Sequence, residues 1–179
     1  SGIWQFILTP ERIITGQFDL WLPSKAALNN DTRFLKSTPE TTLTLPSTAR
    51  KIISAGAYDF RTRAYADFSG RGFTRQTNQV KPDLVAPGVN IITAGNRGGY
   101  EAVTGTSFAA PFVTGAAALL MQWGIINGND PFLYGEKVKA CLIRGARHLP
   151  GYDIWPNERV GYGSLCVSES LPLRSGGEG

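Results

Sequence analysis

The sequence predicts an α/β fold with a parallel sheet and flanking helices, preceded by a β-rich segment typical of a β-sandwich edge. A continuous apolar run at residues 51–58 is typical of a strand in a sheet covered on both faces. Residues 106–123 are rich in Ala and Gly and predict a helix that is apolar all round and therefore buried. Residues 1–48 instead alternate apolar and polar side chains between turn-rich stretches.

In the β-rich segment we expect three strands, at residues 3–8, 17–22 and 41–45, the last ended by Pro46. The intervening residues 24–38 are polar and turn-rich. We therefore divide the chain into a β-rich segment at 1–48, an α/β part at 49–170 and a tail at 171–179. None of the residue patterns in the first segment suggests catalysis.

The α/β part alternates short strands with helices. Besides residues 51–58, we expect strands at 83–88 and 91–94, and a permissive glycine-rich loop at 95–99. The helix at 106–123 has Pro111 in its first turn, where a missing N–H costs little. A second helix is expected at 135–145 and a short one at 166–170.

Composition excludes several function classes. The 179 residues are 42% hydrophobic, which argues against wholesale disorder, and the net charge of +4 is spread along the chain. We interpret the local group of arginines as a solvated loop face and expect no nucleic-acid partner; its members are Arg61, Arg63, Arg71 and Arg75. The longest apolar run, residues 116–121, falls far short of the ~20 residues that span a bilayer, so we expect no membrane span.

Metal and cofactor signals are missing from the sequence. No His/Cys cluster has zinc-ligand spacing, and neither a dinucleotide-binding nor a Walker glycine motif occurs. Cys141 and Cys166 could form one bridge or remain separate thiols, and we favour separate thiols, which leaves the compartment open. We expect no cofactor and no metal.

Ser107 is the strongest candidate for a catalytic residue. A serine at the mouth of a buried helix lies among unpaired backbone N–H groups and near the positive end of the helix dipole. Both features stabilise the oxyanion that forms when a hydroxyl attacks a carbonyl, and Gly105 permits a close approach of substrate backbone. The alternative is that Thr106 or Ser107 merely caps the helix. Position alone leaves both interpretations open.

The sequence around Ser107 resembles the serine signature of the subtilase family. Residues 105–119 read GTSFAAPFVTGAAAL, and the family pattern is Gly-Thr-Ser-x-Ala-x-Pro, often followed by His and then Val-x-Gly-Ala-Ala-Ala. Phe112 stands where that His often stands. Further segments resemble the family in order: residues 52–58, 66–72 (ADFSGRG), 81–91 (KPDLVAPGVNI) and 160–165 (VGYGSL). The resemblance covers residues 49–170 and implies the C-terminal half of a subtilisin-like parallel sheet with its helices.

The resemblance implies a serine endopeptidase acting on a peptide or protein substrate. Ser107 would be the nucleophile, its own N–H donating to the oxyanion, with Gly105 and Thr106 in the same substrate loop. Val103 and Thr104 would line the leaving-group side of the cleft, unless they are ordinary packing residues of the loop.

The rest of the expected machinery has no match. The family order is Asp, His, Ser, with an oxyanion Asn between His and Ser, yet no His precedes Ser107. The upstream carboxylates lie in the wrong segments (Asp59, Asp67, Asp83), and the upstream amides are loop or strand residues (Asn78, Asn90). We therefore expect Asp, His and Asn in a preceding N-terminal part of the same protease. Without them this chain alone should be inactive. A pseudoprotease or regulatory binding module that keeps the fold is the alternative.

A second catalytic arrangement can be weighed from the sequence. Ser107 with His148 and either Asp130 or Asp153 could mimic an α/β-hydrolase triad. That fold needs Gly-x-Ser-x-Gly at the nucleophile, and Ala109 stands at the second glycine position. We therefore prefer the subtilase interpretation.

The β-rich start resembles one subgroup of the family. Subtilases with a jelly-roll insertion, notably the germination-specific Csp-type proteases of spore formers, carry that insertion between the Asn and Ser segments. The resemblance implies that residues 1–48 end such an insertion and favours an extracellular or spore-associated location. Half a parallel sheet would expose an edge and a helix face, so we also expect self-association when the N-terminal part is absent.

Overall fold

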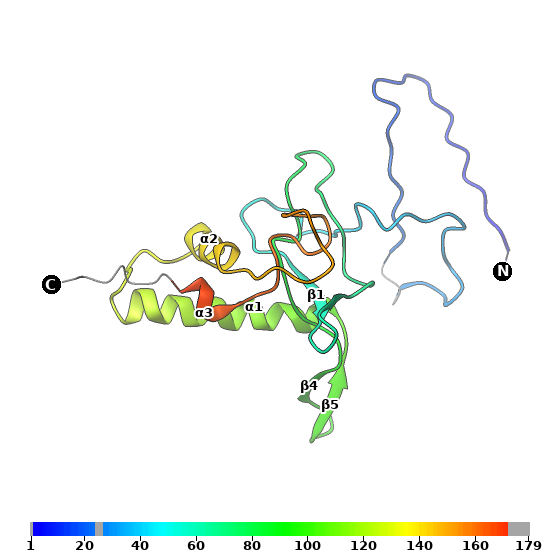
Figure 1. Ribbon diagram of the computed structural model, residues 1–179. Coiled ribbons are helices and arrows are strands. Elements are labelled where there is room, and N and C mark those ends of the chain that lie inside the picture. Colours follow the sequence, from blue (N-terminus) through cyan, green and yellow to red (C-terminus); the bar gives the residue numbers. More distant parts are fainter. Residues whose placement is uncertain (1, 24–26, 172–179) are drawn as a thin grey trace. The chain divides into compact units, whose positions relative to one another are not determined.

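The computed structural model describes residues 2–23 and 27–171, and the chain divides into two units, Ser1–Thr38 and Pro39–Gly179. Most of the predicted tail and residues 24–26 of the turn-rich stretch lie outside the described residues. All helices and strands of the described residues belong to the second unit (Figure 1).

The expected strands of the β-rich segment do not form in the described residues. Residues 3–8 and 17–22 carry no strand, and their large side chains are exposed; Trp4 is 86% and Phe18 62% exposed. A strand needs a neighbouring strand to pair with along a ladder, and no strand pairing includes residues 3–8 or 17–22 in the described chain. Residues 41–45 also form no strand. The Thr42 N–H donates to the Arg71 carbonyl, but the Arg71 N–H donates to the Thr42 hydroxyl and not to its carbonyl, so no ladder forms there.

The central sheet contains the expected parallel pair. β1 (Ala55–Asp59) and β3 (Leu84–Pro87) run parallel with Ala55 opposite Leu84, and β2 (Ala64–Tyr65) pairs antiparallel with β1, which gives the order β2-β1-β3. β1 begins later than predicted, since the N–H of Ser54 donates to the Asp83 carboxylate at 2.7 Å. Ser164 adds an isolated parallel bridge to Val85.

A β-hairpin leads into the helix that begins at Thr106. The sequence predicts only one of its two strands. β4 (Ile91–Ala94) matches the expected strand, and β5 (Tyr100–Val103) pairs antiparallel with it across the glycine-rich turn. The sequence predicts no strand at residues 100–103, because their side chains include an exposed Glu and Tyr. The hairpin extends away from the central sheet in Figure 1.

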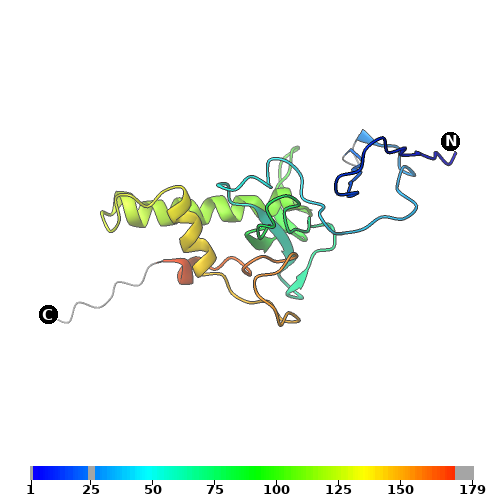
Figure 2. The ribbon, with the colours of Figure 1, turned by 90° about the horizontal axis from the view of Figure 1, so that it is seen from above.

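The helices lie close to their predicted positions. α1 (Thr106–Met121) continues into a π-helical turn, Gln122–Ile126. α2 (Glu136–Arg144) is flanked by glycines at both ends and runs across α1 (Figure 2), and α3 (Val167–Ser170) is one short turn. The patterns of small and periodic apolar residues are thus confirmed as helices.

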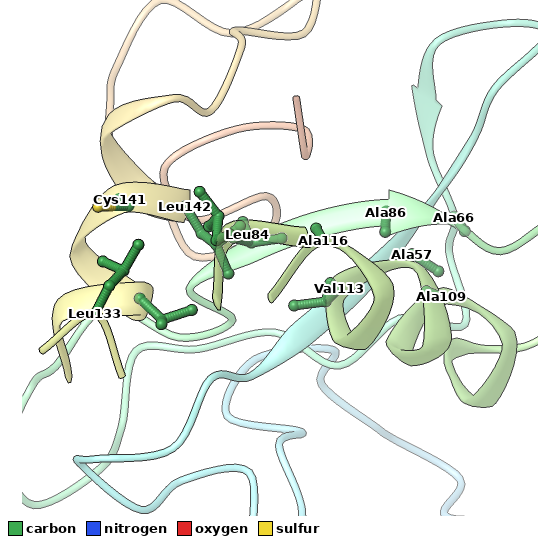
Figure 3. Packing of buried hydrophobic residues seen from close by; sticks show 12 residues of the cluster. Ala57, Ala66, Leu84, Ala86, Ala109, Val113, Ala116, Leu133, Cys141 and Leu142 are labelled. Carbon is green, nitrogen blue, oxygen red and sulfur yellow. The ribbon is translucent and has the colours of Figure 1, made fainter. Parts of the chain in front are cut away.

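One face of α1 forms the core of the second unit. Its buried residues, Ala109, Val113, Ala116 and Leu120, pack against small side chains of the sheet. Figure 3 shows Ala57 of β1 and Ala86 of β3 beside Ala109 and Val113. Small residues on both sides let the helix approach the strands closely, which fixes where its N-terminus lies relative to the sheet.

The other face of α1 is not buried, contrary to the prediction of burial all round. Phe112 is 43% and Leu119 52% exposed, because no described segment covers that face. By length and composition alone the helix Thr106–Ile126 could cross a membrane, and 28% of its apolar 18-residue stretch is buried. Core helices of soluble proteins have the same composition, so this is weak evidence for a span.

A buried charge cluster joins the entries of β1 and β3 to α2. The Asp83 carboxylate lies 2.7 Å from Lys81 Nζ and 2.8 Å from Lys139 Nζ. Both ammonium groups also donate to the carbonyl of Ile52. Burial lowers the pKa of Lys81 from its ordinary value, the nearby Asp83 opposing and Lys139 adding to that shift. The cluster holds together three segments: the residues that lead into β1, those that lead into β3, and α2.

Candidate active site

The turn that carries Ser107, residues 103–107, is hereafter the serine turn, and it is fastened to the carboxyl ends of β1 and β3. The N–H of Gly105 donates to the carbonyl of Gly88 at 2.8 Å, and the N–H of Gly88 donates to the carbonyl of Tyr58 at 3.0 Å. A Cβ at Gly88 would lie 2.6 Å from Cβ of Ala57 and 3.0 Å from the Gly105 carbonyl oxygen. Only glycine therefore lets the strand end and the serine turn come this close.

Gly105 has a backbone conformation reserved for glycine. Its φ of 156° and ψ of 159° lie in a region that side chains exclude. Gly105 is also the N-cap residue of α1, and no side chain caps the helix. The alternative that Thr106 or Ser107 serves as a side-chain cap is therefore wrong.

Ser107 is exposed at the second residue of α1. The first four N–H groups of a helix have no partner in the preceding turn, and the helix dipole places partial positive charge there. Phe108 turns its N–H back to the Gly105 carbonyl at 3.1 Å, whereas the described residues offer no such acceptor to the N–H of Ser107. Donors of this kind can bind an anionic oxygen next to the Ser107 hydroxyl.

Val103 and Thr104 connect the hairpin to the serine turn. Val103 is the last paired residue of β5, opposite Ile91. Thr104 is exposed, and its Oγ1 accepts a hydrogen bond from the N–H of Asn90 at 2.9 Å. Sequence reasoning had no signal for this contact, which joins residues 14 positions apart.

A polar pocket of about 400 Å³ lies beside Thr106. Its wall includes the start of β1 and the loop of the ADFSGRG segment. Side-chain hydroxyls are the commonest polar groups of this wall; they belong to Thr42, Thr44, Ser47, Ser54, Ser69 and Thr106. The Arg71 guanidinium also reaches it, 5.3 Å from the Tyr65 ring and 3.6 Å from the Glu40 carboxylate.

No base contacts Ser107 within residues 2–23 and 27–171. The ring of His148 stacks on Trp155, with centroids 4.0 Å apart and planes at 2°. Asp130 pairs with Lys137, whose hydrogen bond lowers the pKa of that carboxyl. Among the described residues, no contact therefore joins Ser107, His148 and Asp130 as the alternative triad would require.

The upstream carboxylates are engaged elsewhere or face the pocket. Asp83 belongs to the buried charge cluster, Asp59 accepts the N–H of Arg61, and Asp67 lines the pocket. Among the described residues, no three His, Cys, Asp or Glu side chains are grouped so that they could hold a metal ion. Cys141 and Cys166 are free thiols.

Comparison with known proteins gives a consistent result along most of the chain. The model of the subtilase family, Peptidase S8, matches residues 24–163. The membrane-bound transcription factor site-1 protease of Mus musculus is 35% identical over 139 residues, which cover 75% of this chain and 12% of that protein. The serine protease AprX of Bacillus subtilis is 32% identical over 154 residues, 73% of this chain and 32% of that protein.

Solved structures agree with the sequence relatives. The CspB protease of Clostridium perfringens has a TM-score of 0.76 and 46% identity, covering 80% of this chain and 30% of that one. The prenylagaramide maturation protease PagA has a TM-score of 0.59 and 31% identity, covering 74% and 46%. The chain therefore spans less than half of each of these relatives. On the family match and on these similarities, the chain belongs to the subtilase family and has part of its subtilisin-like α/β fold.

Proposed function

We propose that this chain is the C-terminal part of a subtilisin-like serine endopeptidase and that Ser107 is its nucleophile. The observation that carries the proposal is the exposed Ser107 at the start of α1, on a glycine turn and beside N–H donors of the first helical turn. In the reaction, Oγ of Ser107 attacks the scissile carbonyl, and the carbonyl oxygen becomes an oxyanion that accepts from the N–H of Ser107. Gly105 and Thr106 form the same substrate loop.

The proton of Ser107 must pass to a base that the described residues do not bring to it. We assign the Asp, the His and the oxyanion Asn to an N-terminal part of the same protease. Two features support this assignment: the chain spans 30% of the length of CspB, and one face of α1 exposes apolar side chains such as Phe112 and Leu119. That face and the pocket beside β1 are where the N-terminal part would pack. The chain alone is then inactive.

We propose a location and a biological role from the resemblance to the Csp-type subgroup. The resemblance of the β-rich start to that subgroup favours residues 1–48 as the end of a jelly-roll-like insertion, and an extracellular or spore-associated protease; the similarity to the CspB protease supports the choice of subgroup. By the same resemblance, the substrate is the precursor of an enzyme that degrades spore cortex. The exposed large side chains of residues 3–22 are then available to pack within the inserted domain.

Labelling with a fluorophosphonate tests the nucleophile. The full-length protein that contains this chain should bind one equivalent of probe at Ser107, and Ser107→Ala should abolish the adduct. Ser168→Ala is the matched control, because Ser168 is also an exposed serine in the first turn of a helix, α3. A folded full-length protein that takes up no probe would instead be a pseudoprotease or regulatory module, and would overturn the assignment of Ser107.

A further inference from the structure

Where the β4–β5 ladder ends, the side-chain hydroxyl of Thr104 accepts a hydrogen bond in place of a backbone carbonyl. In the register of this hairpin Ile91 is opposite Val103, so the next pair outward would be Asn90 opposite Thr104. Asn90 has φ of 52°, a left-handed conformation that extended strands do not adopt. The backbone ladder therefore stops, and the Thr104 hydroxyl, at 2.9 Å, accepts the Asn90 N–H.

Two hydrogen bonds thus hold the serine turn against the turn between β3 and β4. The first runs from the Gly105 N–H to the Gly88 carbonyl at 2.8 Å, and the second is the Asn90–Thr104 contact. The ladder ends at the Ile91–Val103 pair, and the Gly105 bond lies two residues further on, so the Asn90–Thr104 bond fixes the one residue between these two attachments. Ser107 is only three residues after Thr104, so the orientation of the serine turn determines where the Ser107 hydroxyl lies.

We propose that Thr104 is a positioning residue for Ser107, acting through its hydroxyl on the orientation of the serine turn. This inference rests on the proposed function, and it assigns Thr104 a role distinct from lining the leaving-group side of the cleft. Because both Thr104 and Asn90 are exposed, the hydrogen bond adds little to global stability, and its main effect is local. A shift of the nucleophile by about 1 Å can lower a rate about 100-fold.

The test compares Thr104→Val with Thr104→Ser in the full-length protein. Valine keeps the shape and removes the acceptor, while serine keeps the acceptor. The rate constant for fluorophosphonate labelling should fall about tenfold or more in Thr104→Val and Thr104→Ala, and stay within about twofold in Thr104→Ser. Thr93→Val, a threonine exchange in β4 of the same hairpin, is the control and should leave the rate unchanged.

The probe separates the two roles of Thr104, since it carries no residues after the bond that breaks. A leaving-group residue would change KM among peptides that differ after the scissile bond but not the labelling rate, and that result would overturn the inference. Amide hydrogen exchange gives a second readout: the Asn90 N–H should exchange faster in Thr104→Val and as in wild type in Thr104→Ser. Equal labelling of wild type and Thr104→Val refutes only the role of Thr104. An unlabelled wild type refutes the proposed function, and this role with it.

Discussion

Replacing Asp83 by Asn tests how the two central strands are held together. The Asp83 carboxylate is 3% exposed and lies 2.7 Å from Lys81 Nζ and 2.8 Å from Lys139 Nζ. The same group accepts the Ser54 N–H at 2.7 Å. Asparagine keeps the shape and one acceptor oxygen, but it removes the carboxylate charge that pairs with both ammonium groups of this cluster.

The expected loss of stability is large for a change of so few atoms. Removing one partner of a buried ion pair typically costs about 3–5 kcal/mol, because the remaining charge stays desolvated. Lys81 is 1% exposed and cannot turn to water, whereas Lys139 is 16% exposed and can recover part of its hydration. We therefore expect Asp83→Asn to lower the free energy of unfolding by about 3–5 kcal/mol, mostly through Lys81.

Urea unfolding of the full-length protein, followed by tryptophan fluorescence, measures this loss. The control is Glu169→Gln, which removes a carboxylate 2.9 Å from Arg147 where both side chains are more than half exposed. Exposed pairs contribute about 0–1 kcal/mol, so the control should change little. If Asp83→Asn costs no more than Glu169→Gln, the cluster does not hold the strands together and the reasoning is refuted.

Two further replacements test the approach of the serine turn and the exposed face of α1. Gly88→Ala places a methyl group 2.6 Å from Cβ of Ala57 and should cost about 1–3 kcal/mol in urea unfolding. It should also slow fluorophosphonate labelling about tenfold or more, and unchanged labelling would show that the turn tolerates displacement. A methyl group at Gly115 would meet no described atom within 4 Å outside its own helix backbone, so Gly115→Ala should raise helix stability by about 1 kcal/mol if the face stays open. Burial under the N-terminal part predicts a loss of about 1–3 kcal/mol instead, and a gain in the full-length protein would contradict that packing.

In the second unit, the elements that could be predicted from sequence are those whose buried residues form a recognisable apolar pattern. β1 and α1 carry small apolar side chains because they pack on each other, and that composition is visible without a structure. β5 was missed because Tyr100 and Glu101 are exposed in it, so neither periodicity nor apolar content marks a strand. The predicted strands at 3–8 and 17–22 show the converse. Alternating apolar and polar residues predict a strand with one apolar face. The strand forms only where a second strand and a packing surface are present.

The candidate site divides in the same way. Ser107 was identified from its motif, whereas the choice between nucleophile and helix cap depended on which residue begins α1. The sequence Gly105-Thr106-Ser107 allows either, and only the backbone angles of Gly105 decide it. The Thr104–Asn90 contact depends on the left-handed backbone conformation of Asn90, which follows β3. A single asparagine in a sequence does not predict that conformation.

The closeness of Ala57 and Gly88 has a consequence for engineering this scaffold. The two positions, 31 residues apart in the sequence, share one small volume beneath the serine turn, so they have room for a single methyl group. Mutant libraries that vary either position alone will discard almost every enlarged side chain. A library that varies both together can move the methyl group from one strand to the other, as in Ala57→Gly combined with Gly88→Ala, because the first change removes the Cβ that the second would meet at 2.6 Å.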